Sequence, residues 1–268
     1  MRILEAPKAQ EVLELNWPLV ADFLTRFIRE ELSWRGYEKA IVAVSGGVDS
    51  ATTLALAVRA LGAERVHALF LPHRESSTSR EHAYLVAETF GGALEEVDIT
   101  PMVEGYAALT PDLTPHRKGN VMARARMIVL FDKSEAYRAL PLGTGNKTER
   151  LFGYFTWHGD DTPPVNPLGD LYKTQVWRLA EHLGVPEEVV RKPPTADLIP
   201  GQTDEADLGL RYLRADVILE HYLKGYSDQY ILGLGFTEEE LRRVKERVNR
   251  THWKRALPTV ALLSSTAI

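Results

Sequence analysis

The sequence contains no cysteine among its 268 residues. This absence excludes disulfides, thiolate metal sites, iron–sulfur clusters and cysteine nucleophiles. No segment approaches the run of about 20 apolar residues that a membrane-spanning helix needs. The first ten residues, MRILEAPKAQ, contain no apolar signal core. We therefore expect no membrane association and a cytoplasmic location.

The chain also lacks a large net charge, because acidic and basic residues nearly balance. Lys and Arg total 32, Asp and Glu total 37, and the formal net charge is −5. This balance gives no electrostatic reason to expect a nucleic-acid partner. Hydrophobic residues make up 44% of the chain, as in ordinary globular proteins. No linker divides the sequence, so we expect a single domain over residues 1–268.

Short apolar runs alternate with segments of helical periodicity in the first half of the chain. Four runs predict buried strands, at 40–44, 66–71, 94–99 and 140–144. Apolar residues at helical spacing predict helices at 12–32, 53–61, 79–90 and 120–131. Strands separated by helices indicate an α/β fold, in which a parallel sheet carries helices on both faces.

After residue 149 the periodicity predicts mainly helices. These are expected at 172–183, 186–190, 212–223 and 237–249. Three connections are long enough to be candidate lids, at 100–119, 159–167 and 192–204.

The carboxyl ends of the expected strands mark the place where a ligand should bind, as in other open α/β sheets. We therefore expect one edge of the sheet to bring together the loops that follow Val44, Leu71, Ile99 and Thr144.

The segment SGGVDS at 45–50 is the strongest motif, and it directly follows the first expected strand. Its glycines let the backbone approach a ligand closely, and the following helix start offers N–H groups to an anion. The Asp49 carboxylate would repel a phosphate unless a cation such as Mg²⁺ lies between them. The alternative is a plain strand-to-helix turn in which Asp49 favours the helix dipole.

This segment resembles the SGGxDS loop of the ATP pyrophosphatases, which cleave ATP between its α and β phosphates. The resemblance implies an adenine-nucleotide-α-hydrolase-like (Rossmann-like) three-layer fold with extra C-terminal helices. It also implies ATP contacts at Val44, Ser45, Gly46, Gly47, Val48, Asp49 and Ser50. The loop alone does not decide the substrate, because GMP, asparagine and NAD synthetases and tRNA-modifying enzymes share it.

The segment GTGNKTE at 143–149 narrows the choice. Thr144 is placed to bond a ribose, base or phosphate, and Glu149 would supply a second carboxylate for Mg²⁺ opposite Asp49. The alternative is a helix start rich in capping residues, with Glu149 in solvent. The segment is similar to the GTxNK[ST]E motif of NAD synthetases.

Three later segments resemble the same family in the same order. They are KGNVMARARM at 118–127, NPLGDLYKT at 166–174, and PTADL at 194–198 with QTDE at 202–205. The resemblance covers about residues 41–258. It implies that Thr144, Lys173 and Thr195 contact ATP, that Asp49 and Lys173 are catalytic, and that Asp49 and Glu149 hold Mg²⁺. Arg124 corresponds to a dinucleotide-binding position, whereas Arg126 serves either the ligand or local packing.

The chain departs from the family pattern where the pyridine nucleotide is expected to bind. Trp157 replaces a lysine, Pro164 replaces an aspartate, and Trp253 replaces the histidine of a His-Lys pair whose Lys254 is kept. A tryptophan ring can stack on a pyridine or adenine ring. The resemblance implies substrate contacts at Arg124, Trp157, Trp253 and Lys254. The changes are either neutral or alter substrate preference, for instance toward nicotinate mononucleotide.

The family resemblance implies ATP-dependent amidation of deamido-NAD, the last step of NAD biosynthesis. An acyl-adenylate forms with release of pyrophosphate, and ammonia then releases AMP. Glutamine-using relatives carry a fused amidase domain with a cysteine nucleophile, whereas here 44 residues precede the loop and the chain has no cysteine. The expected nitrogen source is therefore free ammonia or ammonia delivered by a separate protein. The resemblance also implies a homodimer, in which Trp17, Phe23 and Phe27 belong either to the interface or to the core.

Three alternatives remain open at this point. One is amidation of nicotinate mononucleotide, and another is a different adenylating ligase that uses the SGGxDS loop. The third is a nucleotide-binding module without catalysis, which would have little need for two carboxylates that converge on a metal.

Overall fold

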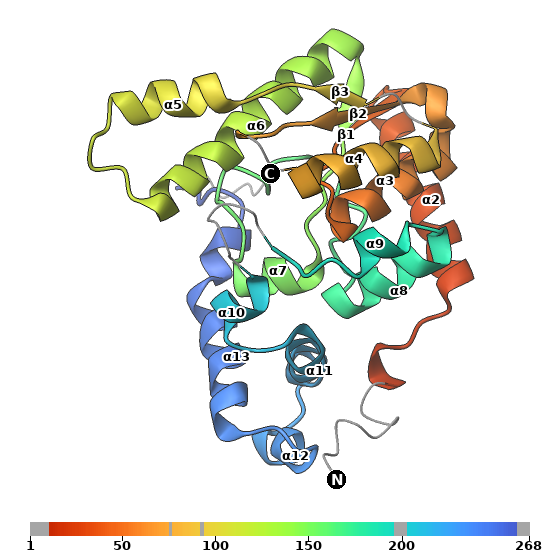
Figure 1. Cartoon of the computed structure of the whole chain (residues 1–268). Helices are drawn as coiled ribbons and strands as arrows, with labels where there is room; N and C mark the ends of the chain where they lie inside the picture. The colour runs from red at the N-terminus through yellow and green to blue at the C-terminus, as the bar shows by residue number, and fades with distance from the viewer. Residues whose placement is uncertain (1–10, 75–76, 92–93, 196–202, 262–268) are drawn as a thin grey trace.

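The computed structural model describes residues 11–74, 77–91, 94–195 and 203–261. Its centre is a four-stranded parallel sheet with the strand order β3-β2-β1-β4 (Figure 1). The strands are β1 Lys39–Ala43, β2 Val66–Phe70, β3 Leu94–Glu96 and β4 Ala139–Pro141. The expected parallel sheet is therefore confirmed. None of the helices in the described ranges is long and apolar enough to cross a membrane.

Helices cover both faces of this sheet. Alternate side chains of each strand point to opposite faces, and both faces are apolar, so each needs a covering layer. Ala40 and Val42 of β1 pack in one apolar cluster, while Ile41 packs in another. The first cluster involves α2 Trp17–Trp34, α3 Val48–Leu61, α4 Ser77–Phe90, α8 Lys173–Leu183 and α9 Glu187–Val190. The second involves α5 Thr100–Ala108 and α6 Pro115–Tyr137. This arrangement confirms the expected three-layer α/β fold.

The remaining helices, which come mainly from the C-terminal part of the sequence, lie together in the lower part of Figure 1, away from the sheet. They are α7 Lys147–Phe152, α10 Asp204–Leu208, α11 Tyr212–Leu223, α12 Asp228–Gly233 and α13 Glu238–Arg250. Short 3₁₀ segments occur at Glu11–Leu13, Ala63–Arg65 and His252–Arg255. Buried residues of α11 and α13 form a third apolar cluster, and Trp177 packs against both this cluster and the one that contains β1. The extra C-terminal helices are confirmed.

Several boundaries differ from the sequence prediction. The helix expected at 12–32 is interrupted, because Asn16 caps a new helix start and Pro18 lies in its first turn. The predicted lid at 100–119 is wrong: its first nine residues form α5, and α6 begins at Pro115 behind the N-cap Thr114. Strands β3 and β4 are shorter than predicted, since regular pairing ends at Glu96 and Pro141.

Candidate active site

A cavity of about 1050 Å³ opens at the carboxyl edge of the sheet. Its wall includes the loops that follow β1, β2 and β4, as the sequence predicts. The residues directly after Ile99 instead form α5 and are not among the described residues that line the cavity. Segments from the later connections, 160–162 and 192–195, complete the wall together with 254–258. Ligand pockets commonly measure about 300–1,000 Å³, so the space suits a nucleotide.

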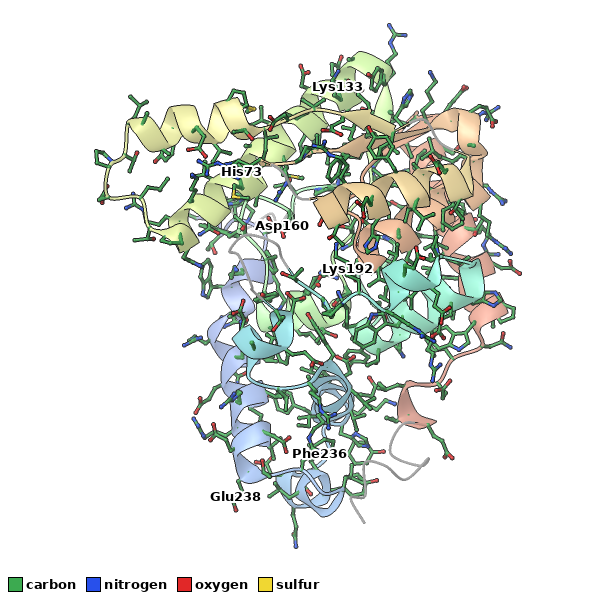
Figure 2. The ribbon with its side chains drawn as sticks, in the orientation of Figure 1. His73, Lys133, Asp160, Lys192, Phe236 and Glu238 are labelled. Atoms are coloured by element: carbon green, nitrogen blue, oxygen red, sulfur yellow. The ribbon has the colours of Figure 1, made fainter. Side chains whose placement is uncertain are left out.

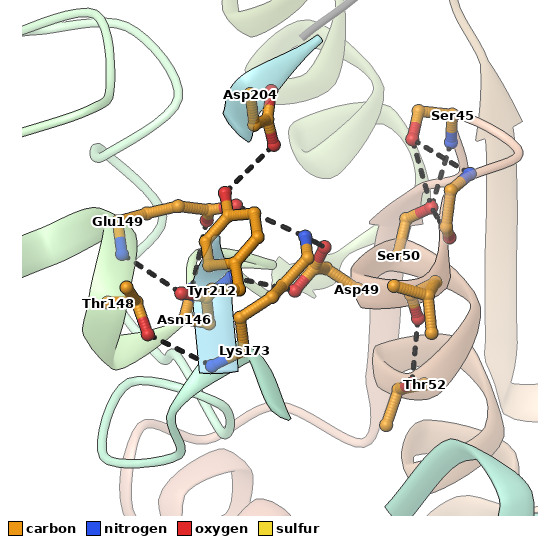
Figure 3. Close-up of polar contacts among 12 residues, drawn as sticks. Ser45, Asp49, Ser50, Thr52, Asn146, Thr148, Glu149, Lys173, Asp204 and Tyr212 are labelled. Carbon is orange, nitrogen blue, oxygen red and sulfur yellow. Dashed lines mark hydrogen bonds and ion pairs between the residues drawn. The ribbon is translucent and has the colours of Figure 1, made fainter. Parts of the chain in front are cut away.

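The SGGVDS segment forms a closed turn between β1 and α3 (Figure 3). The Ser50 hydroxyl accepts a hydrogen bond from the Ser45 N–H at 3.1 Å and donates to the Gly47 carbonyl at 3.0 Å. Gly47 is the N-cap of α3 and provides no side-chain cap, so the first N–H groups of α3 have no side-chain acceptor. This helix start can therefore bind an anion.

Gly46 adopts a left-handed conformation with φ of 76°, which favours glycine. A Cβ atom here would lie 2.3 Å from the Ser79 carbonyl oxygen of α4. Gly46 is therefore needed for close packing of the turn against α4. It does not line the cavity, in contrast to the other residues of the segment 44–50.

The Lys173 ammonium group lies between the carboxylates of Asp49 and Glu149 (Figure 3). Lys173 Nζ pairs with Asp49 Oδ2 and is 3.4 Å from Glu149 Oε1. The Lys173 side chain is 3% exposed. Burial alone would lower the pKa of Lys173, but the two carboxylates outweigh burial and raise it. Burial raises the pKa of Glu149, although Lys173 opposes that shift. The three predicted site residues thus form one ionic cluster.

Asn146 connects the two carboxylates, and the sequence analysis did not assign it a role. Its amide donates to Asp49 at 2.9 Å, and its Oδ1 accepts the Glu149 N–H at 2.9 Å. The Glu149 carboxylate accepts the Asn146 N–H in return, which completes a capping box at the start of α7. The GTGNKTE segment is therefore a capped helix start, as the alternative interpretation expects, but Glu149 is not in solvent: its side chain is 19% exposed and shares the Lys173 ammonium with Asp49. The Asn-x-x-Glu spacing was the available signal.

Asp204 is a further carboxylate of the cavity wall that the sequence analysis left without a role of its own. It is 3% exposed and accepts hydrogen bonds from the hydroxyls of Tyr212 at 2.9 Å and Tyr154 at 3.2 Å. Burial raises the pKa of Asp204, while Lys173 lowers it. The Tyr212 ring also lies 5.4 Å from Lys173 Nζ. Three carboxylates, those of Asp49, Glu149 and Asp204, therefore interact with the Lys173 ammonium.

Asp216 of α11 fixes the helix starts that present these groups. Its fully buried carboxylate accepts the Thr148 hydroxyl at 2.6 Å, and the N–H and hydroxyl of Thr174 at 2.9 and 2.7 Å. The Thr148 hydroxyl in turn accepts a hydrogen bond from the backbone N–H of Lys173 at 3.0 Å. Burial raises the pKa of Asp216 to about 6 against these donors. No sequence motif marked this residue, because one aspartate in an apolar helix has no distinctive spacing.

Of the four residues expected to bind the pyridine nucleotide, Trp157 contacts both Arg124 and Trp253 beside the cavity. Trp157 and Trp253 meet edge to face, with ring centres 5.2 Å apart. Arg124 donates to the Trp157 carbonyl at 2.9 Å, and Lys254 Nζ donates to the carbonyls of Gly153 and Phe155. Burial lowers the pKa of Lys254. Trp157 and Lys254 line the cavity, whereas Arg124 and Trp253 support them from outside the described wall.

The other predicted positions have varied settings. Thr144 and Thr195 line the cavity, and so does Arg126, whose Nε donates to the Leu71 carbonyl at 3.0 Å. Arg126 therefore holds the end of β2 at the cavity. Pro164 is exposed and is not part of the described wall. Residues 196–202, which contain most of the PTADL segment and Gln202, lie outside the described residues.

The donor set suits Mg²⁺, although within the described ranges no three acidic, His or Cys side chains form a complete metal cage. Mg²⁺ prefers oxygen ligands and is usually bound by one or two carboxylates plus substrate phosphates. Asp49 and Glu149 provide two such carboxylates beside the anion-binding turn. Burial raises the pKa of Glu149, and the neighbouring carboxylates of Asp49 and Asp204 add to the rise, so a divalent cation at this point would stabilise the ionised form of Glu149.

Comparison with known proteins decides the family. The family model described as NAD synthase matches residues 20–258. The NH(3)-dependent NAD(+) synthetase of Trichlorobacter lovleyi is 46% identical over 96% of this chain and 94% of its own length. The chain belongs to the NAD synthase family. The family and the enzyme class expected from the motifs, a ligase, are thereby confirmed.

Solved structures of two synthetases have the same fold as this chain. The NMN synthetase of Francisella tularensis superposes with a TM-score of 0.82 at 29% identity, covering 92% of this chain and 99% of that chain. The NH3-dependent NAD synthetase of Campylobacter jejuni gives 0.80 at 26% identity, covering 92% and 100%. The range 20–258 matched by the family model contains all the described residues that line the cavity, from Ala43 to Pro258.

Proposed function

We propose that this chain forms NAD from deamido-NAD, ammonia and ATP, with release of AMP and pyrophosphate. The convergence of Asp49, Glu149 and Lys173 beside the SGGVDS turn is the observation that carries the proposal. Relatives that are 45–46% identical over nearly the whole chain are NH(3)-dependent NAD(+) synthetases. These relatives support deamido-NAD as the acid and ammonia as the nitrogen donor.

In the first step, the substrate carboxylate attacks the α-phosphate of ATP, and pyrophosphate leaves. The free N–H groups at the start of α3 and the hydroxyls of Ser45 and Ser50 bind the phosphates. Thr144 and Thr195, both in the cavity wall, contact the nucleotide. Fixed donors aimed at the charge that develops on the phosphates lower the barrier without reorganisation.

In the second step, ammonia attacks the acyl-adenylate carbonyl, the amide forms and AMP leaves. No covalent protein nucleophile is needed. The chain contributes by holding the two reactants together, and such positioning can account for several orders of magnitude in rate. The Lys173 ammonium contacts the reacting phosphates, and the Asp49 carboxylate acts on them through the bound cation. Asn146 orients Asp49, and Asp216 orients the start of α8, where Lys173 lies, through the contacts described above.

We assign Mg²⁺ to Asp49 and Glu149 as the cofactor. When bound, it neutralises phosphate charge and acts as a Lewis acid on the phosphoryl oxygens. The Lys173 ammonium pairs with the carboxylates of Asp49 in α3 and Glu149 in α7, and so keeps these two ligands near each other.

We assign the pyridine nucleotide to the end of the cavity that contains Trp157 and Lys254, with Arg124 and Trp253 in support. A preference for the mononucleotide acid is not favoured, because the more similar curated relatives are NAD synthetases. The solved NMN synthetase is less similar, at 29% identity.

A homodimer is also proposed, with α2 as part of the interface. Phe23 and Leu19 of α2 are exposed to 55% and 65%, whereas Trp17 and Phe27 pack partly against the core. Light scattering of the purified chain tests this assembly. The single domain and the cytoplasmic location stay predictions.

The deciding experiment supplies the purified chain with ATP, Mg²⁺ and either deamido-NAD or nicotinate mononucleotide. Ammonium or glutamine is the sole nitrogen donor. We expect equal amounts of NAD and AMP with deamido-NAD and ammonium, and little product with glutamine. Inactivity on both acids would refute the proposed reaction, and robust use of glutamine would refute the ammonia assignment. A purely nucleotide-binding module would release no AMP in any mixture.

A further inference from the structure

Lys192 lies beside the SGGVDS turn, although no motif assigned it a role. It follows α9 in the sequence, and Figure 2 labels its side chain. It lines the same cavity as Asp49 and Lys173. Its ammonium group donates to the Ser79 hydroxyl at 3.0 Å and is 3.4 Å from the Gly46 carbonyl oxygen. One positive charge is therefore fixed directly on the turn that binds phosphate in the proposed function.

Ser79, which accepts the hydrogen bond from Lys192, belongs to the first turn of α4. Ser79 is buried to 7% exposure and lines the cavity. Its carbonyl is so close to Gly46 that no side chain fits between the two segments. Three features therefore pack against one another: the first turn of α4, the glycine turn and Lys192. A phosphate bound at the glycine turn would lie close to all three.

Lys192 adds a further ammonium group to the wall of the cavity that contains Lys173. The Lys173 ammonium faces two carboxylates, so much of its charge is already compensated. Adenylation breaks the bond between the α-phosphorus and its bridging oxygen, and the electron pair stays on the departing pyrophosphate. The leaving group thus gains negative charge, and a second cation near the turn stabilises it.

We propose that Lys192, together with the Ser79 hydroxyl, binds the β- and γ-phosphates of ATP and then the departing pyrophosphate. This assignment rests on the proposed function, because it names a further contact for the leaving group of the same reaction. The carbonyl and hydroxyl that Lys192 contacts in this structure hold its ammonium group at the turn until phosphate oxygens replace them as acceptors.

The test compares Lys192→Met with Lys192→Arg, and uses Lys245→Met as a matched control. Lys245 lies on α13, pairs with Asp228 and is not among the described residues that line the cavity. Product inhibition by inorganic pyrophosphate and by AMP is measured for each variant, together with kcat/KM for ATP. Calorimetric titration with Mg²⁺ and inorganic pyrophosphate measures binding without turnover.

Loss of one hydrogen bond from a charged donor corresponds to about a ten- to one-hundredfold loss in affinity. We therefore expect Lys192→Met to weaken pyrophosphate inhibition and kcat/KM for ATP by about this factor, while AMP inhibition stays unchanged. Lys192→Arg keeps most of the wild-type affinity, since it keeps the charge. Ser79→Ala, which leaves the lysine in place, weakens pyrophosphate binding less.

Two results would overturn the assignment. One is an unchanged inhibition constant for pyrophosphate in Lys192→Met. The other is an equal weakening of pyrophosphate and AMP inhibition, since that would mean that Lys192 only anchors the wall of the cavity. A wild-type chain that makes no NAD but binds pyrophosphate through Lys192 would instead refute the proposed reaction and leave the phosphate contact standing.

Discussion

The side-chain amide of Asn146 donates a hydrogen bond to the Asp49 carboxylate, with 2.9 Å between Nδ2 and Oδ1. These residues are 97 positions apart in the sequence. They meet because β1 and β4 are parallel neighbours, so the loops at their carboxyl ends share one edge of the sheet. Asn146 also caps α7 and thereby orients Glu149. One amide side chain therefore sets the relative position of both proposed Mg²⁺ ligands.

Removing either carboxylate should abolish the metal-dependent chemistry. We expect Asp49→Asn and Glu149→Gln each to lower kcat/KM for ATP by about 10²–10³-fold, the usual cost of losing one group that stabilises charge in a transition state. AMP formation is measured over a Mg²⁺ titration. Asp228→Asn, an exposed carboxylate paired with Lys245, is the control and should behave as wild type. Wild-type Mg²⁺ dependence in both site variants would contradict the assignment.

Asn146→Ala should reduce activity as well as stability. Loss of the α7 cap costs about 1 kcal/mol in the free energy of unfolding, and loss of the donor to Asp49 lowers kcat by about tenfold. The matched control is Thr237→Ala, because Thr237 begins the capping box of α13 away from the cavity wall. Urea denaturation and AMP release are compared. If both variants lose stability but neither loses activity, Asn146 is only a helix cap.

Gly46→Ala should destabilise the chain more than a glycine substitution with the same backbone conformation elsewhere. Gly46 and Gly184 have φ of 76° and 78°, but a Cβ atom contacts Ser79 only at Gly46, and no atom lies within 4 Å at Gly184. Backbone strain alone costs about 1 kcal/mol, and the clash raises the cost to about 1–3 kcal/mol. We expect Gly46→Ala also to weaken ATP binding, which calorimetry measures. Equal destabilisation by the two variants would show that α4 yields freely.

Glu240 should stabilise the C-terminal helices in a pH-dependent manner. Burial alone would raise the pKa of Glu240, but Arg214 and the capping contacts with Thr237 outweigh it and lower the pKa to about 2. Arg214 Nη2 is 2.6 Å from Glu240 Oε2. Because the unfolded chain takes up the proton first, this contribution is complete above the ordinary pKa of 4.5 and is lost as the pH falls from there toward 2.

Glu240→Gln removes this contribution. The free energy of unfolding of the Glu240→Gln variant should be about 1–2 kcal/mol below that of wild type near neutral pH. This difference between variant and wild type should narrow in acid. Urea denaturation at about pH 6 and about pH 3 measures both values. Glu246→Gln, at an exposed carboxylate of the same helix, is the control. A gap that stays constant or widens in acid would contradict the predicted role of Glu240.

The sequence predicted most of the fold because its apolar periodicity is local. Residues 40–44 and 66–71 are short, apolar runs rich in β-branched or aliphatic side chains, a pattern typical of buried strands. The helix at 212–223 was predicted with the observed bounds. The predictions failed where capping side chains decide a boundary. Asn16 starts a helix within an apolar stretch, and Thr114 with Pro115 starts α6 before the apolar pattern becomes regular.

By itself, the sequence determined the family, the phosphate turn and the two carboxylates, since each depends on residues that are neighbours along the chain. Only the tertiary structure decided what these groups contact. It brought Lys173 between Asp49 and Glu149, placed Lys192 on Gly46, and buried Asp216 beneath the starts of α7 and α8. Such contacts join segments about 25–150 residues apart, and loop closure over that length leaves no trace in local spacing.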